Sequence, residues 1–352
     1  MPADFIHALP KAELYLHLEG TVEPATLAEL SRRHVAAPPF PGNRYQQPLQ
    51  GLKELSEAEV RELYCYQDFQ GFLMAFKAVT ERLRTPEDYE LITYKLMERL
   101  WSQHVRHAEV YVSVGVVHWR GQEFAPLFAG MERGRRRGEK DFGVSLLWLF
   151  DAVRNFGVEA AERVLQEAIS SRQQSDAVIG FGIGGDELRG PAELFRSIFE
   201  SARAHGLRLT AHAGENAGPE SIWAALNIGA ERIGHGLNAA ADSELMAVLG
   251  ERQVPVEICL TSNLRTQCCP ALEMHPLRNF FERGLMITLN SDDPAMFGSS
   301  FLDEYRLAQQ HFEFSDEQLR ELARNSFEAS FLSAQKKLKF LDEIDSMDYL
   351  EA

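Results

Sequence analysis

The 352-residue sequence has few cysteines, no long hydrophobic run and no recognisable leader segment. Its four cysteines include no Cys-x-x-Cys pair and no regular spacing, which argues against a disulfide framework. No apolar run approaches the ~18 residues that a membrane-spanning helix needs, and no signal peptide precedes the first strand. We therefore expect a cytoplasmic protein with reduced thiols.

The sequence also has fewer positively charged than negatively charged residues. Lys and Arg number 36 against 52 Asp and Glu, which gives a formal net charge of −16. Such an acidic surface argues against general binding to nucleic acid or to an anionic membrane, but it permits a small neutral ligand in a pocket. With 45% hydrophobic residues, the chain can bury a sizeable core. No repeat, low-complexity segment or linker interrupts it, so we expect residues 1–352 to form one domain.

Short apolar stretches alternate with amphipathic stretches along most of the chain, as in proteins with parallel sheets covered by helices. The pattern predicts a TIM (β/α)8 barrel, with an open doubly wound sheet as the alternative. The expected strands are 12–20, 106–114, 144–150, 178–184, 207–213, 232–236, 254–261 and 286–290. The expected helices are 21–33, 57–83, 86–104, 124–138, 158–172, 191–205, 219–228, 240–251, 275–283, 300–312 and 316–331.

A long insertion, about residues 35–104, separates the first two expected strands. It opens with a loop-like segment, 34–50, and continues with helices. One of these carries apolar side chains at i, i+3, i+4 and i+7, the spacing of an amphipathic helix. Core packing is the simpler interpretation of that stripe, and a lid over a pocket is the alternative. The stripe consists of Phe69, Phe72, Leu73 and Phe76.

The first expected strand alternates leucines with polar residues, so each set faces one side of the sheet. In a half-buried surface strand the polar set would face water. In a barrel it would point inward, and polar side chains at the carboxyl end of a barrel strand usually serve chemistry. We favour the second interpretation because three other strand ends also carry ionisable residues. The polar set is Glu13, Tyr15, His17 and Glu19.

Those three strand ends belong to the fifth, sixth and eighth expected strands. The fifth carries His212, with Glu215 three residues later, and the sixth carries His235. The eighth is followed by Asp292 and Asp293, whose side chains would diverge in an extended chain. Imidazoles with a carboxylate suit Zn²⁺, which lowers the pKa of bound water to ~7. Glu215 could lie beside such a metal and exchange a proton with the substrate.

Four motifs make the sequence resemble the adenosine deaminase family of the amidohydrolase superfamily. They follow the family's order, and the match runs from about residue 10 to residue 330. The resemblance implies a TIM barrel with one Zn²⁺ or another divalent ion at its mouth. It also implies a purine nucleoside or base as the partner, whose 6-amino group is hydrolysed to a 6-oxo group with release of ammonia. The motifs are PKAELYLHLEG at 10–20, TAHAGE at 210–215, RIGHG at 232–236 and SDDP at 291–294.

The resemblance further implies roles for single residues. His17, His212 and Asp292 match the family's metal ligands. Glu215 matches the residue that protonates purine N1 and so activates C6 for attack. His235 matches the base and electrostatic partner of the attacking hydroxide.

Three other positions match substrate contacts. Asp293 matches the group that hydrogen-bonds purine N7, and Gly185 matches the glycine whose backbone meets N3. Glu19 stands near the ribose 5′ side, where adenosine-specific members commonly carry Asp. Together with segments 68–73 and 182–187, Glu19 makes the sequence more similar to adenine deaminases and 6-aminodeoxyfutalosine deaminases than to animal adenosine deaminases.

One residue departs from the family pattern at the metal site. The opening motif His-x-His is Tyr15-Leu16-His17 here, so one expected zinc ligand is missing. A phenol with a pKa of ~10 binds Zn²⁺ less readily than an imidazole near neutral pH. Three ligands would remain, the usual number in a catalytic zinc site. The alternative function is therefore a purine-binding relative with weakened metal binding and little or no turnover.

Two other signals do not support a function. Residues 180–185 satisfy Gly-x-Gly-x-x-Gly, but they lie within an expected strand and no helix opens directly after them, so the dinucleotide-binding context is missing. The His-x-Glu and Pro-Cys-x-x-Cys signature of the cytidine deaminase fold is absent, which excludes that class of zinc deaminase.

Overall fold

The computed structural model describes residues 4–38, 40, 51–66 and 68–349, and part of the expected loop 34–50 lies outside these ranges. Eight strands form a single sheet whose order follows the sequence, and all neighbouring strands are parallel. The strands are β1 (Lys11–His17), β2 (Val105–Val112), β3 (Ser145–Val153), β4 (Val178–Gly184), β5 (Arg208–Ala213), β6 (Arg232–His235), β7 (Val256–Ile258) and β8 (Ile287–Leu289).

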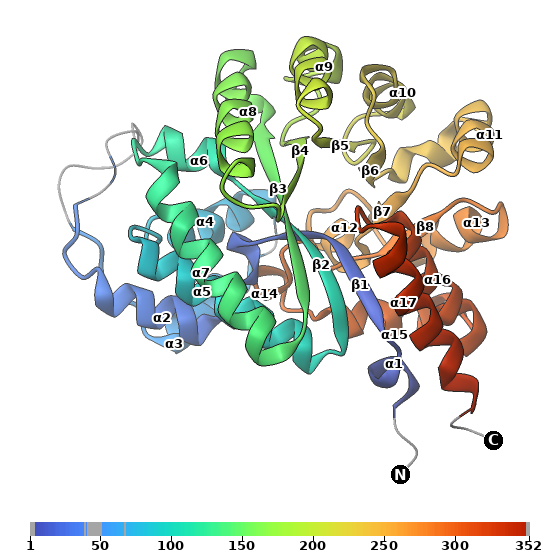
Figure 1. The fold of residues 1–352 in the computed structure, drawn as a ribbon, viewed down its shortest axis with the longest axis horizontal. Coiled ribbons are helices and arrows are strands. Elements are labelled where there is room, and N and C mark those ends of the chain that lie inside the picture. Colours follow the sequence, from blue (N-terminus) through green and yellow to red (C-terminus); the bar gives the residue numbers. More distant parts are fainter. Residues whose placement is uncertain (1–3, 39, 41–50, 67, 350–352) are drawn as a thin grey trace.

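The two edges of the sheet meet. A parallel bridge joins Leu16 of β1 to Asp292, just after β8, and the amide of His17 donates to the Asp292 carbonyl at 2.9 Å. The Asn290 side-chain oxygen also accepts from the amide of Leu14 at 2.8 Å. The sheet is therefore a nearly closed barrel surrounded by helices, as Figure 1 shows. The predicted TIM barrel is confirmed, and the open doubly wound sheet is excluded.

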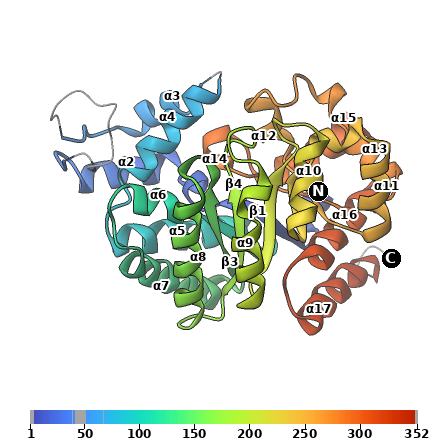
Figure 2. The same ribbon diagram turned by 90° about the horizontal axis from the view of Figure 1, so that it is seen from above.

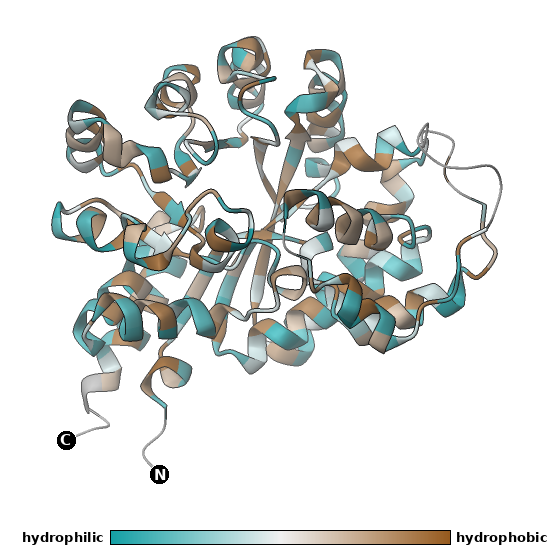
Figure 3. Ribbon diagram, turned by 180° about the vertical axis from the view of Figure 1, so that it is seen from behind, coloured by the Kyte–Doolittle hydropathy of each residue, from teal (hydrophilic) through white to brown (hydrophobic). Residues whose placement is uncertain are grey.

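Helices cover the outside of the barrel, and further helices precede its first strand and follow its last. Figure 3 shows polar and apolar residues mixed along these helices, as expected where one face packs on the sheet and the other meets water. Within the described residues, none of the helices is long and apolar enough to cross a membrane. The helices are α1 (Phe5–Ala8), α2 (Pro24–Arg33), α3 (Glu57–Leu63), α4 (Phe69–Thr80), α5 (Pro86–Ser102), α6 (Val114–Trp119), α7 (Phe124–Phe142), α8 (Val158–Arg172), α9 (Arg196–Ala204), α10 (Pro219–Ile228), α11 (Ser243–Arg252), α12 (Leu260–Arg265), α13 (Leu277–Glu282), α14 (Pro294–Phe297), α15 (Phe301–Phe312), α16 (Asp316–Ala329) and α17 (Ala334–Asp345).

The expected helix 57–83 is two helices, α3 and α4. Ser56 opens α3 with a capping box, in which its hydroxyl accepts from the amide of Glu59 and the Glu59 carboxylate accepts from the amide of Ser56. Asp68 then starts a new helix, because its carboxylate accepts from the amide of Gly71. A continuous helix is wrong here because a second N-cap lies inside the amphipathic pattern.

The apolar stripe of α4 divides between two environments. Phe72 and Phe76 are half-buried against the core, and Phe72 stacks on Phe297 of α14 with ring centres 5.3 Å apart. Phe69 and Leu73 are 53% and 48% exposed, so core packing accounts for only half of the stripe. In Figure 2, α3 and α4 lie at the same end of the barrel as α12 and α14, which follow β7 and β8. The lid interpretation of residues 35–104 stays a prediction.

Candidate active site

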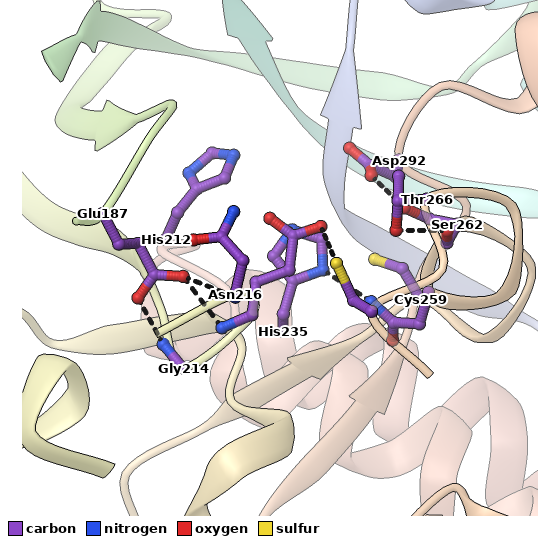
Figure 4. A network of polar contacts seen from close by, with 12 residues as sticks. Glu187, His212, Gly214, Asn216, His235, Cys259, Ser262, Thr266 and Asp292 are labelled. Atoms are coloured by element: carbon purple, nitrogen blue, oxygen red, sulfur yellow. Dashed lines mark hydrogen bonds and ion pairs between the residues drawn. The ribbon is translucent and has the colours of Figure 1, made fainter. Parts of the chain in front are cut away.

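The ionisable side chains at four strand ends converge at the carboxyl end of the barrel. The ring centre of His212 lies 5.5 Å from those of both His17 and His235. His17 Nε2 lies 3.5 Å from Asp292 Oδ1. All four side chains are buried. Figure 4 shows how His212, His235 and Asp292 lie at this end of the barrel. The predicted convergence of residues far apart in the sequence is what the structure shows.

Tyr15 lies among the three histidines. Its ring centre is 5.6 Å from that of His17, 5.0 Å from that of His212 and 5.1 Å from that of His235. The phenol oxygen lies 3.2 Å from His235 Nε2. A Cβ atom at position 234 would come within 2.5 Å of the ring, so Gly234 is what makes room for it. Burial raises the pKa of the Tyr15 phenol well above its ordinary value, so the hydroxyl keeps its proton.

The first strand is shorter than expected. It ends at His17, because Leu18 takes a helical backbone conformation and a 3-10 turn follows at Glu19–Thr21. Glu19 therefore does not continue the alternation of Tyr15 and His17. It remains buried beside β2, where its carboxylate accepts from the amide of Ser113 at 3.1 Å, and burial raises its pKa to about 7.

The expectation of an extended chain at Asp292 and Asp293 is wrong. Asp292 has φ 62°, a left-handed conformation that its hydrogen bonds to β1 hold in place. Its Oδ2 accepts from the Ser262 hydroxyl at 2.6 Å. Asp293 is buried, and its Oδ1 has no hydrogen-bond partner among the described residues. Burial and the charge of Asp292 raise the pKa of Asp293 well above its ordinary range.

Glu215 approaches the histidines from the loop after β5. Its Oε2 lies 3.8 Å from His235 Nε2, and burial raises the pKa of the carboxyl. A second carboxylate, Glu187, holds this loop by accepting from three successive backbone amides, those of Gly214, Glu215 and Asn216, at 2.7 to 3.0 Å. Figure 4 shows hydrogen bonds between the Glu187 carboxylate and the backbone of this loop. Sequence reasoning gave Glu187 no role, because a carboxylate that binds backbone amides leaves no local pattern.

Gly185 follows β4 at the same end of the barrel. Its φ is 91°, a left-handed conformation that favours glycine, and a Cβ there would lie 2.6 Å from Asn155 Oδ1. That oxygen accepts from the amide of Asp186 at 3.0 Å. The turn after β4 therefore requires glycine for its backbone, and the contact with purine N3 stays a prediction.

The donor groups suit a divalent ion. Burial lowers the pKa of both His17 and His212, so the imidazoles are neutral, which is the form that binds metal. Within the described ranges, the ligand atoms that all lie within 4.8 Å of one another belong to His235, Cys259 and Asp292. Among the described residues, His17 and His212 do not form such a set with Asp292, although the rings of both pack against that of Tyr15. Their assignment as ligands stays a prediction.

Comparisons with known proteins find relatives that match nearly the whole chain. The adenosine deaminase family model matches residues 10–347. The chain is 37% identical to an aminodeoxyfutalosine deaminase from Streptomyces avermitilis over 97% of this chain and 92% of that protein. It superposes on the crystal structure of an adenine deaminase from Arthrobacter aurescens with a TM-score of 0.86 and 32% identity, covering 98% of this chain and 100% of that one. An amidohydrolase from Burkholderia ambifaria with bound zinc superposes with a TM-score of 0.82 and 26% identity, covering 98% of this chain and 93% of that one.

Proposed function

The chain belongs to the adenosine deaminase family, and we propose that it hydrolyses the 6-amino group of an adenosine-like purine to a 6-oxo group with release of ammonia. One observation carries the proposal: His17, His212, His235, Asp292 and Glu215 meet at one barrel mouth. The relatives named aminodeoxyfutalosine deaminase and adenine deaminase support a 6-aminopurine as the substrate.

The proposal includes one Zn²⁺ held by His17, His212 and Asp292. The neutral imidazoles and the carboxylate provide suitable donors, and the zinc-bound neighbour supports a divalent ion in this fold. When bound, such an ion supplies water with a pKa of ~7 and so makes hydroxide available at neutral pH. Ser262 orients Asp292 through its hydroxyl, which leaves Asp292 Oδ1 turned toward His17.

Glu215 and Asp293 act on the purine itself. Burial raises the pKa of Glu215, which favours the protonated form that can donate to purine N1 and draw electrons away from C6. Asp293 has a buried oxygen without a partner among the described residues and a raised pKa. A protonated Asp293 can donate to N7, which is an acceptor. Gly185 is assigned to N3 through its backbone, and Glu19 to the edge that carries the ribose or its replacement.

A substrate comparison tests the proposal. We expect purified protein to release ammonia from at least one of adenosine, adenine and 6-aminodeoxyfutalosine, with the absorbance change that accompanies loss of the 6-amino group. The measurement is kcat/KM for each compound at neutral pH with added Zn²⁺. No ammonia from any of the three, in protein that contains stoichiometric metal, would contradict the proposed reaction.

Tyr15 supports a second candidate, a purine-binding protein with little or no turnover. Its buried, protonated phenol replaces a family metal ligand and cannot coordinate as phenolate without losing a strongly held proton. For this candidate we expect metal-free protein that binds one of the same purines tightly and releases no ammonia. Metal analysis alongside the turnover assay separates the two functions.

A further inference from the structure

We infer that Asn263 and His275 are positioning residues that hold the proton of His235 on Nε2, so that His235 faces the substrate as a hydrogen-bond donor. This inference rests on the proposed function for its catalytic meaning. Both residues lie outside the family motifs of the sequence. Their side chains are buried, as is that of His235, so water does not compete for the contacts between them.

Leu277, His275, Asn263 and His235 form a chain of hydrogen bonds, and its first member is a backbone amide that can only donate. Leu277 is the first residue of α13, so its amide has no acceptor within the helix, and it donates to His275 Nδ1 at 3.1 Å. Burial lowers the pKa of His275 to about 3, so its imidazole is neutral. With Nδ1 accepting, the single proton of the His275 ring must lie on Nε2.

The next two contacts transmit this direction to His235. His275 Nε2 lies 3.3 Å from Asn263 Oδ1, which therefore accepts. The other end of the amide, Asn263 Nδ2, lies 3.1 Å from His235 Nδ1 and donates to it. Reversing the Asn263 amide would place two donors against each other at His275. His235 Nδ1 is thus an acceptor, and the proton of the His235 ring lies on Nε2.

This assignment selects a role for His235. Its Nε2 points to the mouth, 3.2 Å from the Tyr15 phenol oxygen and 3.8 Å from Glu215 Oε2, and both oxygens can accept. A general base would need an Nε2 without a proton. His235 therefore stabilises negative charge on the attacking oxygen by donating a hydrogen bond, in the manner of an oxyanion-hole donor.

Nitrogen NMR of the full-length protein labelled with ¹⁵N-histidine tests the inference. The signals of His235 are those that disappear from the long-range ¹H–¹⁵N spectrum of His235→Gln. In the wild type they should show a protonated Nε2 and an unprotonated Nδ1. Asn263→Asp keeps the side-chain shape but presents only acceptors, so we expect the proton of His235 to move to Nδ1. A catalytic histidine held in the wrong tautomer loses on the order of 10⁴-fold in kcat. We expect Asn263→Asp to lose at least ~10²-fold by the same mechanism, with little change in KM.

Two histidine variants provide rescue and control. In His275→Gln the side-chain amide can accept from Leu277 and donate to Asn263, so the tautomer of His235 should be retained. His205→Gln, at an exposed histidine, is the matched control and should change neither spectrum nor rate. A wild-type His235 protonated on Nδ1, or an Asn263→Asp protein in which Nδ1 of His235 stays unprotonated, would overturn the inference. Because the spectra need no turnover, a protein without deaminase activity that shows the predicted tautomers would refute only the proposed function.

Discussion

Replacing Glu215 with glutamine is expected to reduce kcat for deamination by ~10²–10⁴-fold, the usual contribution of a positioned proton donor. Glutamine keeps the size of the side chain and can still meet purine N1, but it has no acidic proton to transfer. KM should therefore change much less than kcat. The pKa of Glu215 is raised by burial, and its Oε2 lies 3.8 Å from His235 Nε2, so the carboxyl is placed to serve this step.

Steady-state kinetics of Glu215→Gln and of Glu220→Gln make the comparison. Glu220 is exposed in the first turn of α10, where its carboxylate accepts from the amide of Gly218, so Glu220→Gln should keep nearly full activity. Thermal unfolding of both variants reveals any loss of structure. If Glu215→Gln retains more than about a tenth of the wild-type kcat, a smaller loss than proton donation implies, Glu215 is not the proton donor.

Replacing Tyr15 with histidine is expected to raise the affinity for Zn²⁺ by at least ~10–100-fold, because even indirect support of a metal ligand is worth that much. The change exchanges a protonated phenol for a neutral imidazole within contact of His17, His212 and His235. The larger tyrosine ring already fits against Gly234, so the smaller histidine ring should fit as well.

Competition with a chromogenic chelator measures the zinc affinity of Tyr15→His, Tyr15→Phe and the wild type. Tyr15→Phe keeps the ring and removes only the hydroxyl, so it should bind no more tightly than the wild type. Tyr111→Phe, at a buried tyrosine whose ring centre lies 5.0 Å from that of Tyr15, is the control for changing an aromatic residue in this cluster. Equal zinc affinity in Tyr15→His and the wild type would show that position 15 does not limit metal binding.

The barrel and the meeting of its strand ends could be predicted from the sequence. Alternation of strands and helices is a local pattern, and in a parallel barrel all carboxyl ends of the strands point the same way. The sequence alone therefore predicts that His17, His212 and His235 lie at one mouth of the barrel. The limits of the strands were less predictable. The seventh expected strand, 254–261, is only Val256–Ile258, because Leu260–Arg265 folds into a short helix.

That short helix explains what sequence reasoning missed at the site. It places Ser262 in hydrogen-bond contact with Asp292 and Asn263 in hydrogen-bond contact with His235. In each pair the two residues lie about thirty positions apart in the sequence. His275 had no expected role because it follows no strand, and Glu187 acts by accepting from backbone amides. Residues that support a functional group through tertiary contacts leave no periodic pattern, whereas residues at strand ends do.

Ammonia release before and after metal removal tests the central claim, that these strand ends form one metal-assisted site for purine deamination. The measurement is the rate with the best 6-aminopurine substrate for protein as purified, for protein treated with a chelator, and for treated protein given back Zn²⁺. We predict that the chelator abolishes the rate and that Zn²⁺ restores it. A rate that is unchanged when metal analysis shows no remaining ion would contradict the account.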